Sequence, residues 1–248
     1  MSVLEQMEPI GLDDMKAVRL MQREDQKYLA SADLLESILE RVADHYYVQR
    51  IAGETLSPYK TLYFDTTTLT MYLQHHNRKL NRQKLRVRTY RATDTTFFEI
   101  KNKNNHQHTQ KLRMPMDVSL FDHALDVPEV MNFIEQNTPY TTQTLIPTLE
   151  NRFHRITLVD KGMSERITLD TDIQFHNHAT GSDANLSQLL VVEVKHRAGT
   201  PATSISRVLH ELHILPRRMS KYCIGTALTD SSVKHNRFKE KLLFIEKI

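Results

Sequence analysis

The segment Leu85-Arg86-Val87-Arg88-Thr89-Tyr90 alternates basic with apolar or uncharged side chains, and Phe98-Glu99-Ile100-Lys101-Asn102-Lys103 repeats the pattern after a short turn. In a β-strand, residues two apart point to the same face of the sheet. Each segment therefore predicts a strand with one charged face and one mostly apolar face. The same alternation recurs in three further segments, 23–28, 166–170 and 192–196. One such strand is typical of a solvated sheet edge, whereas several indicate a closed sheet with a charged interior.

Turn signals and apolar periodicity divide the rest of the chain into strands and helices. The predicted strands cover 21–28, 59–65, 84–91, 96–103, 151–160, 165–170 and 189–197. The predicted helices cover 11–17, 31–41, 118–137 with a break near Pro128, 201–212 and 233–246, while 67–80 reads as a helix or a wide turn and 104–108 as a polar, mobile loop. The sum predicts an α+β protein: an antiparallel barrel surrounded by helices.

Length and composition favour one soluble domain spanning residues 1–248. The 248 residues contain no internal repeat, low-complexity segment or long linker. The single cysteine, Cys223, excludes an internal disulfide framework and a cysteine metal site, and it favours a reducing compartment. The first residues lack a basic and then apolar signal pattern, and no stretch reaches the roughly 20 apolar residues of a membrane span. We therefore predict a cytoplasmic protein, with a membrane-bound partner left open.

The charged strand faces, taken together, predict a basic interior. The net charge is only +3, so a strong positive field has to come from clustering. The side chains that would point inward are Lys27, Arg86, Arg88, Lys101, Arg155, Arg166 and Lys195, with Asp25, Glu99 and Glu193 among them. Cations that converge in a partly desolvated space cost stability unless an anion neutralises them. Arginine also suits phosphate, because its planar fork makes bidentate contacts.

Glycine patterns bear on how phosphates would be held. The six glycines form neither a Gly-x-x-x-x-Gly-Lys motif nor a Gly-x-Gly-x-x-Gly motif. Any bound phosphates would therefore contact side chains rather than a glycine-rich backbone loop. Nucleic acid is disfavoured as a partner, since the chain shows no recognisable binding module and no exposed aromatic residues interleaved with basic ones.

Several of these residues have a second interpretation. Glu193 fits either a metal ligand or a salt-bridge partner of Lys195 or Arg88, and Asp25 and Glu99 fit orienting partners of nearby cations. Lys221 lies outside a clear strand and could be a surface lysine. The basic run Lys79, Arg82 and Lys84 fits a tunnel rim or an ordinary solvated segment equally well. The histidine pairs 106/108 and 176/178 lack further ligands nearby and are interpreted as solvated.

The ordered set of motifs resembles the VTC domain, the catalytic domain of the vacuolar transporter chaperone polyphosphate polymerase, in the triphosphate tunnel metalloenzyme superfamily. The resemblance covers about residues 20–226. The motifs are Arg-x-Asp-x-Lys-Tyr at 23–28, Leu-Arg-Val-Arg at 85–88, Glu-x-Lys at 99–101, Arg-Ile-Thr-Leu-Asp at 166–170, Val-Glu-Val-Lys at 192–195 and Ser-Lys-Tyr at 220–222. Two departures are Phe153, where the family often has tyrosine, and Arg-x-Asp-x-Lys, where the hydrolase branch has Glu-x-Glu-x-Lys.

The resemblance implies a closed, eight-stranded antiparallel tunnel that grips a triphosphate. The implied phosphate-binding residues are Lys27, Arg86, Arg88, Lys101, Arg155, Arg166, Lys195 and Lys221, and those implied to be catalytic are Lys27, Arg86, Arg88, Lys101 and Lys221. Glu193 matches the family's metal-ligand carboxylate, with Mn²⁺ or Mg²⁺ as the ion. The first strand has fewer carboxylates than the hydrolase pattern, which argues against that branch.

The function expected on this basis is a metal-dependent polyphosphate polymerase, an ATP-dependent phosphotransferase. It would transfer the γ-phosphoryl group of ATP to a growing inorganic polyphosphate chain. The acceptor is already an anionic oxygen nucleophile, so the lack of a histidine on the charged faces is no obstacle. Two alternatives stay open: a tripolyphosphatase or nucleoside triphosphatase, and a non-catalytic polyphosphate-binding module.

Overall fold

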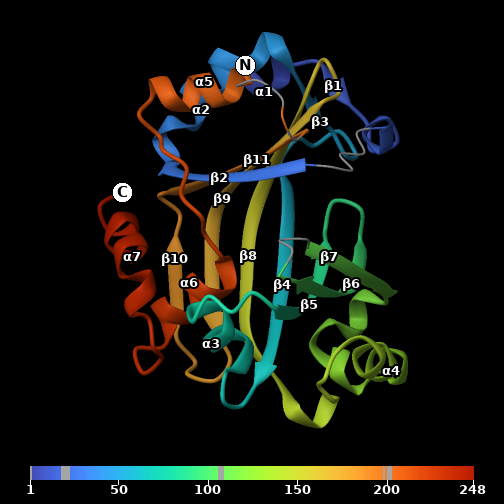
Figure 1. Cartoon of the computed structure of the whole chain (residues 1–248). Helices are drawn as coiled ribbons and strands as arrows, with labels where there is room; N and C mark the ends of the chain where they lie inside the picture. The colour runs from blue at the N-terminus through green and yellow to red at the C-terminus, as the bar shows by residue number, and fades with distance from the viewer. Residues whose placement is uncertain (1, 18–22, 106–108, 198, 200–202) are drawn as a thin grey trace.

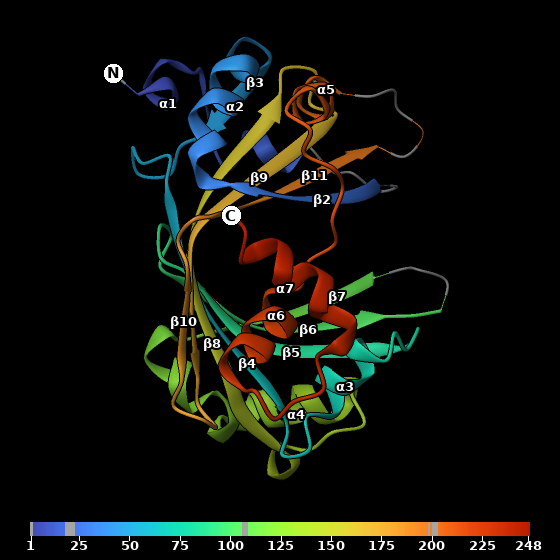
Figure 2. The ribbon, with the colours of Figure 1, turned by 90° about the vertical axis from the view of Figure 1, so that its left-hand side faces the viewer.

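The computed structural model describes residues 2–17, 23–105, 109–197, 199 and 203–248, and its centre is one continuous, strongly bent β-sheet (Figures 1 and 2). Eight strands follow each other in the spatial order β2-β11-β9-β8-β4-β5-β6-β7, and every neighbouring pair is antiparallel. Their bounds are β2 Arg23–Ser31, β4 Ser57–Thr66, β5 Arg82–Tyr90, β6 Thr95–Lys103, β7 Thr109–Met116, β8 Leu145–Asp160, β9 Glu165–Asn177 and β11 Leu189–Arg197.

Three short strands extend the sheet. β10 (Asp183–Leu186) pairs with β9, and β3 (Tyr46–Gln49) pairs with β8 and, in parallel, with β1 (Pro9–Ile10). The long strands β8 and β9 run through both halves of the molecule, so the strands on either side of them turn to face each other (Figure 2). β2 and β11 lie in one half, and β5, β6 and β7 lie in the other.

The closed barrel expected from the sequence is not confirmed. In the described part of the chain, the two edge strands β2 and β7 do not pair with one another, and the sheet stays open between them. A physical reason lies in the charges at this opening, because Lys27 on β2 and Lys101 on β6 repel one another across it. Closing the ladder would bring such like charges nearer still.

Helices cover the outer face of the sheet on two sides. Leucine and isoleucine positions of α2 (Leu35–Val42) and α5 (Ser204–Glu211) pack on the apolar faces of β2, β9 and β11, beside α1 (Val3–Gln6). α4 (Pro128–Asn137) and the 3₁₀ segment η4 (Val118–Asp126) cover β4, β5 and β6. The other 3₁₀ segments are η1 Asp14–Ala17, η2 Ala32–Leu34, η3 Ala43–His45, η5 Thr142–Thr144 and η6 Asn236–Phe238.

One helix lies on the inner face instead. α6 (Lys221–Thr229) packs its Tyr222, Cys223 and Ile224 against apolar residues of β8, β9 and β11, with α3 (Thr70–His76) and α7 (Lys239–Ile245) behind it. Gly225 allows this close approach, because a Cβ at this position would lie 2.5 Å from the Phe175 ring and 2.6 Å from Leu149. α6 therefore fills one end of the concave side of the sheet (Figure 2).

Most predicted elements agree with the structure within a few residues, including the break at Pro128 and the strand 189–197. Among the strands and α-helices of the described residues, six were not predicted: α1, β1, β3, β7, β10 and α6. Parts of other predictions lie outside the described residues, namely the start of the strand predicted from Met21, the end of the polar loop 104–108, and the helix start at Pro201.

Candidate functional site

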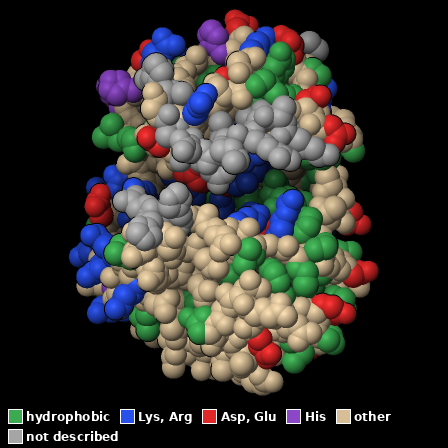
Figure 3. Space-filling model, turned by 45° about the vertical axis from the view of Figure 1, so that its right-hand side comes forward, with side chains coloured by type: hydrophobic (Ala, Val, Ile, Leu, Met, Phe, Trp, Pro, Cys, Tyr) green, Lys and Arg blue, Asp and Glu red, His purple; other side chains and the backbone are tan. Residues whose placement is uncertain are grey.

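The alternation of the strands places the charged side chains on the concave face, between the two halves of the sheet. Apolar neighbours such as Leu85, Val87 and Val194 point to the outer face and are buried under the helices. By strand register, the described part of the chain places the following basic side chains on or beside the concave face: Lys27, Arg82, Lys84, Arg86, Arg88, Lys101, Lys103, Lys111, Arg113, Arg155, Arg166, Lys195 and Lys221. In the same described residues, four carboxylates accompany them, Asp25, Glu99, Asp170 and Glu193. Figure 3 shows blue side chains gathered in a hollow between the two halves, which we call the cationic cleft.

Like charges lie directly opposite one another across β5, β6 and β7. In the register, Lys84 pairs with Lys101, and Lys101 pairs in turn with Lys111. Two residues further along, Arg82 pairs with Lys103. Like charges at directly opposed positions destabilise a sheet. The fold therefore carries a row of repelling cations, which is the arrangement that a bound polyanion would stabilise.

Glu99 is the one carboxylate inside this row, and it is 1% exposed. Its Oε2 accepts from Arg86 Nε at 2.8 Å, and its Oε1 forms an ion pair with Lys111. Burial alone would raise the pKa of Glu99, but Arg86, Arg88 and Lys111 outweigh burial and lower the pKa to about 2. Glu99 therefore stays ionised and orients two of the cations, in agreement with its predicted role as an orienting partner.

Aromatic rings support the arginines at the centre of the cleft. The rings of Tyr59 and Phe153 stack at 5.0 Å, and the Arg155 guanidinium lies 4.9 Å and 5.3 Å from their centroids. Arg88 lies 5.6 Å and 5.7 Å from the same rings, and its Nε donates to Thr61 Oγ1 at 2.9 Å. The rings attract both guanidinium groups through cation–π contacts and so help to fix their positions on the concave face.

Asp170 binds two cations on the other side of the cleft. It accepts from Arg155 through both carboxylate oxygens, at 2.6 Å and 2.8 Å, and forms an ion pair with Lys221. Asp170 is 3% exposed, and Arg155 and Lys221 outweigh the effect of burial and hold its pKa well below the usual range. The bidentate geometry fixes Arg155, because two parallel hydrogen bonds define the guanidinium plane.

Glu193 lies between two lysines, with Lys195 Nζ at 3.2 Å and Lys27 Nζ at 3.6 Å. Among the residues that the structure describes, no group of three or more His, Cys, Asp and Glu side chains is placed to hold a metal ion. One carboxylate cannot form a resident metal cage. It does fit Mg²⁺ or Mn²⁺ carried by a substrate, since such ions are bound by one or two carboxylates together with phosphates and water.

Desolvation lowers the pKa of lysines in the cleft, among them Lys84, Lys101, Lys111, Lys195 and Lys221. Burial, followed by Lys27, Lys84 and Arg86, lowers the pKa of Lys101 to about 7. Burial also lowers the pKa of Lys221 to about 8, although Asp170 partly opposes that change. Both groups would take up or keep a proton when an anion binds beside them, so the cleft's charge rises as it binds a polyanion.

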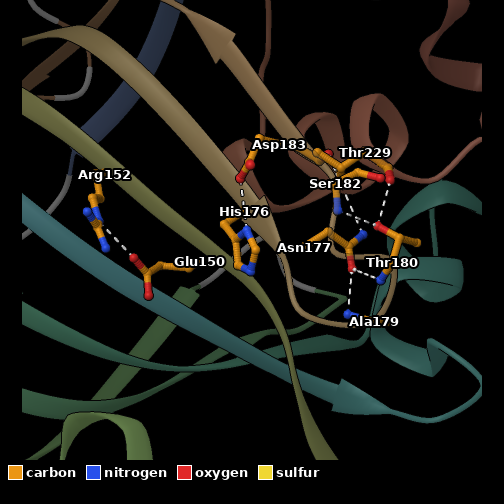
Figure 4. A network of polar contacts seen from close by, with 10 residues as sticks. Glu150, Arg152, His176, Asn177, Ala179, Thr180, Ser182, Asp183 and Thr229 are labelled. Carbon is orange, nitrogen blue, oxygen red and sulfur yellow. Dashed lines mark hydrogen bonds and ion pairs between the residues drawn. The ribbon is translucent and has the colours of Figure 1, made fainter.

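A second hollow of about 660 Å³ lies on the outer side of β8, β9 and β10 and has a different character. Its charged side chains pair with one another: Arg152 donates to Glu150 at 2.8 Å, and His176 contacts Asp183 at 2.8 Å (Figure 4). Opposite charges are balanced there, so this hollow offers no field for a polyanion. The histidine pair 176/178 lies at this surface, with ring centroids 5.0 Å apart.

The structure brings all nine predicted site residues onto the concave face, while their roles stay predictions. The sequence reasoning missed Lys111 and Asp170 as members of the cleft, and it left Lys84 open between a tunnel rim and a solvated segment. Lys84 continues the spacing of two that Arg86 and Arg88 define, so the signal for it was present. Lys221 is not a solvated surface residue, because Asp170 and the Phe153 ring contact its ammonium group.

Comparisons with known proteins identify a family and a fold. The family model described as the VTC domain matches residues 22–229. A search of curated proteins found no match. Two solved structures share the fold. A candidate adenylyl cyclase from Hippeastrum, reported to have a dominant triphosphatase activity, is 13% identical, with a TM-score of 0.54 over 83% of this chain and 96% of that one. A candidate adenylate cyclase from Bacillus halodurans is 15% identical, with a TM-score of 0.51 over 81% and 96%.

No helix in the described residues is both long and apolar enough to cross a membrane.

Proposed function

The chain belongs to the VTC domain family, and from this premise we propose that it is a metal-dependent polyphosphate polymerase. It transfers the γ-phosphoryl group of ATP to the end of an inorganic polyphosphate chain. The bond between the γ-phosphorus and the β–γ bridging oxygen breaks, and a bond forms between that phosphorus and the terminal oxygen of the acceptor. ADP leaves, and the acceptor is longer by one phosphate.

The observation that supports this proposal most is the excess of cations along β5, β6 and β7. The rows Arg86–Glu99, Lys84–Lys101–Lys111 and Arg82–Lys103 succeed one another every two residues, or roughly 7 Å. Together, these three rows therefore extend beyond the length of a triphosphate. A single nucleotide would leave part of them uncompensated, whereas an extended polyphosphate would neutralise them.

In this mechanism the protein positions the reactants and neutralises their charge. Arg86, Arg88 and Arg155 bind phosphoryl oxygens, and the Tyr59 and Phe153 rings hold the last two of these guanidinium groups in place. Glu193 would hold Mn²⁺ or Mg²⁺ together with the substrate phosphates, and that ion would offset the negative charge on the phosphoryl oxygens. The polyphosphate oxygen is ionised already and needs no general base.

Hydrolysis is the competing chemistry, because the Hippeastrum protein of the same fold is reported as a triphosphatase. A hydrolase has to orient and activate a water molecule. Three carboxylates of the cleft are each paired with lysine or arginine: Glu99, Asp170 and Glu193. These pairings favour transfer to an anionic acceptor over activation of water.

Incubation of the pure protein with γ-labelled ATP and Mn²⁺, followed by gel electrophoresis, tests the proposal. We expect a ladder of acid-labile labelled polymer. Lys101→Ala should abolish the ladder, since Lys101 lies in the cationic row, and Lys239→Ala on the exposed start of α7 serves as the matched control. Labelled orthophosphate without polymer would replace the polymerase by a triphosphatase. Bound ATP without turnover would leave a polyanion-binding module.

A further inference from the structure

The first turn of α6 enters the cationic cleft and contacts three different strands with three consecutive residues. Ser220, the N-cap residue, accepts from Lys84 Nζ of β5 at 2.6 Å. Lys221 binds Asp170 of β9. Tyr222 donates its hydroxyl to Asp65 Oδ2 of β4 at 2.6 Å. The position of Lys221 therefore depends on how this turn is held.

Asp65 is a fully buried carboxylate at the end of β4 that only hydrogen bonds satisfy. It is 0% exposed, and it accepts from the backbone N–H groups of Met71 and Tyr72 at 2.9 Å each and from that of Thr66 at 2.7 Å. The first two bonds fix the start of α3. The fourth, from Tyr222, joins α6 to the same carboxylate, so Asp65 sets the position of α6 relative to α3 and β4.

The other end of α6 is held separately. Asn177 Nδ2 donates to Thr229 Oγ1 at 3.0 Å, and Thr180 Oγ1 donates to the Thr229 carbonyl at 2.9 Å (Figure 4). Gly225 fixes the middle of the helix against Phe175. Loss of the Tyr222 hydroxyl would therefore leave the helix packed and free only its first turn, which carries Lys221.

We propose that Asp65 and Tyr222 are positioning residues: their buried hydrogen bond holds the first turn of α6 so that the Lys221 ammonium group reaches the phosphate-binding cleft. This inference rests on the proposed triphosphate site. The groups that face Lys221 are Asp170 on β9, Arg155 on β8, Lys27 on β2 and the Phe153 ring, whose centroid is 4.3 Å from Nζ. Asp65 is 0% and Tyr222 is 1% exposed, so both would act through Lys221 rather than by contacting a phosphate in the cleft.

Tyr222→Phe removes the hydroxyl and keeps the ring, which stacks on Tyr63. Tyr72→Phe is the matched control, because Tyr72 belongs to the same aromatic cluster but donates to the Lys234 carbonyl, away from the cleft. We expect Tyr222→Phe to weaken tripolyphosphate binding on the order of tenfold, as for loss of a hydrogen bond to a charged group. Tyr72→Phe should leave the affinity unchanged. Isothermal titration calorimetry measures both.

A double variant separates positioning from general stability. If Tyr222 acts through Lys221, then Tyr222→Phe has no further effect on affinity in a Lys221→Ala background. Additive losses would overturn the proposal, as would an unchanged affinity in the single variant. Asp65→Asn, which keeps the shape of the side chain, should repeat the result of Tyr222→Phe.

A readout that needs no ligand keeps this test independent of the proposed function. The pKa of Lys221, about 8 in the native protein, can be followed by the NMR shift of its ¹³C-labelled Cε. We expect Tyr222→Phe to raise this pKa toward the ordinary lysine value, because the ammonium group leaves its buried position. An unchanged Lys221 pKa would contradict the proposal even if the protein proves to bind no triphosphate, and absence of binding with a raised pKa would overturn only the proposed function.

Discussion

The two sides of the cationic cleft hold similar cations in opposite ways. On the side of β8, β9 and β11, Arg155 and Lys221 share Asp170, and Lys27 and Lys195 share Glu193. On the side of β5, β6 and β7, the described strands carry one carboxylate, Glu99, and like charges oppose one another in the register. The basic residues on this side are Arg82, Lys84, Arg86, Arg88, Lys101, Lys103, Lys111 and Arg113. We call these the paired side and the unpaired side. The carboxylates of the paired side neutralise its cations in part without a ligand, whereas a bound anion would relieve the like-charge repulsion on the unpaired side.

Removing a carboxylate from the paired side should cause the largest change, a loss in the free energy of unfolding. Asp170→Asn leaves Arg155 and Lys221 buried without a carboxylate, and removal of one partner from a buried ion pair costs about 3–5 kcal/mol. Urea unfolding measures the loss. Asp172→Asn is the control, because Asp172 lies two residues away, is partly exposed, and contacts His154 and Gln174 rather than a buried lysine or arginine. Equal stability of the two variants would show that the paired side is not preorganised.

Removing a positive charge from the unpaired side should not lower the free energy of unfolding. Lys101→Gln should leave the free energy of unfolding unchanged or raise it by up to about 1 kcal/mol, because it relieves like-charge repulsion. The same variant should bind tripolyphosphate about tenfold or more weakly, through loss of a charge-assisted contact. Lys239→Gln on the surface of α7 is the control for both measurements. A destabilised Lys101→Gln protein would mean that this lysine has a structural partner.

Gly225→Ala should disturb the link between α6 and the paired side. The added Cβ would overlap the Phe175 ring, and overpacking of this kind costs about 1–3 kcal/mol. The higher helix propensity of alanine offsets up to about 1 kcal/mol of that loss. Lys221 should move with the helix, so the affinity for tripolyphosphate should fall as well. Wild-type affinity in this variant would show that Lys221 does not depend on the placement of α6.

The smallest effect expected is a pH dependence carried by Lys101. The pKa of Lys101 falls from 10.5 to about 7 in the folded protein, first through desolvation and then through Lys27, Lys84 and Arg86. Lys101 therefore opposes folding below pH 7 and ceases to do so as the pH rises toward 10.5, but the effect on stability is small because its side chain is exposed to screening solvent. We expect bound tripolyphosphate to raise the pKa of Lys101, because a nearby anion favours the charged form. The affinity for tripolyphosphate should therefore be highest below pH 7 and should fall above it by up to about tenfold per pH unit.

Titrations of the wild type and of Lys101→Gln at several pH values isolate this contribution, because the ionisation of tripolyphosphate itself is common to both proteins. The ratio of the two affinities should shrink as the pH rises above 7. A ratio that does not change with pH would show that Lys101 is charged throughout.

The sequence predicted which residues lie on the concave face, because side chains alternate between the two faces of a strand with a period of two. Lys27, Arg86, Arg88 and Lys195 each belong to a segment in which every second residue is charged or polar. β7 escaped prediction although Lys111 and Arg113 alternate with Leu112 and Met114, since Pro115 interrupts the pattern. Pro115 is tolerated here because β7 is an edge strand.

Helix α6 and its contacts could not be predicted from local patterns. The segment Lys221–Thr229 contains Gly225 and β-branched residues, and it is buried on almost every side, so it shows no amphipathic period. The bonds from Tyr222 to Asp65 and from Lys221 to Asp170 join residues 157 and 51 positions apart. Only the three-dimensional structure shows that α6 lies inside the sheet, and that the predicted barrel is open between β2 and β7.

The central claim is that the unpaired side of the cleft is a site for an extended polyanion. Calorimetric titration with pyrophosphate, tripolyphosphate and long-chain polyphosphate at one ionic strength tests it most directly. We expect the affinity to rise at each step, because each longer ligand reaches another pair of opposed cations, from Arg86 through Lys84 and Lys101 to Arg82 and Lys103. Equal affinity for the three ligands, or no binding, would contradict the claim.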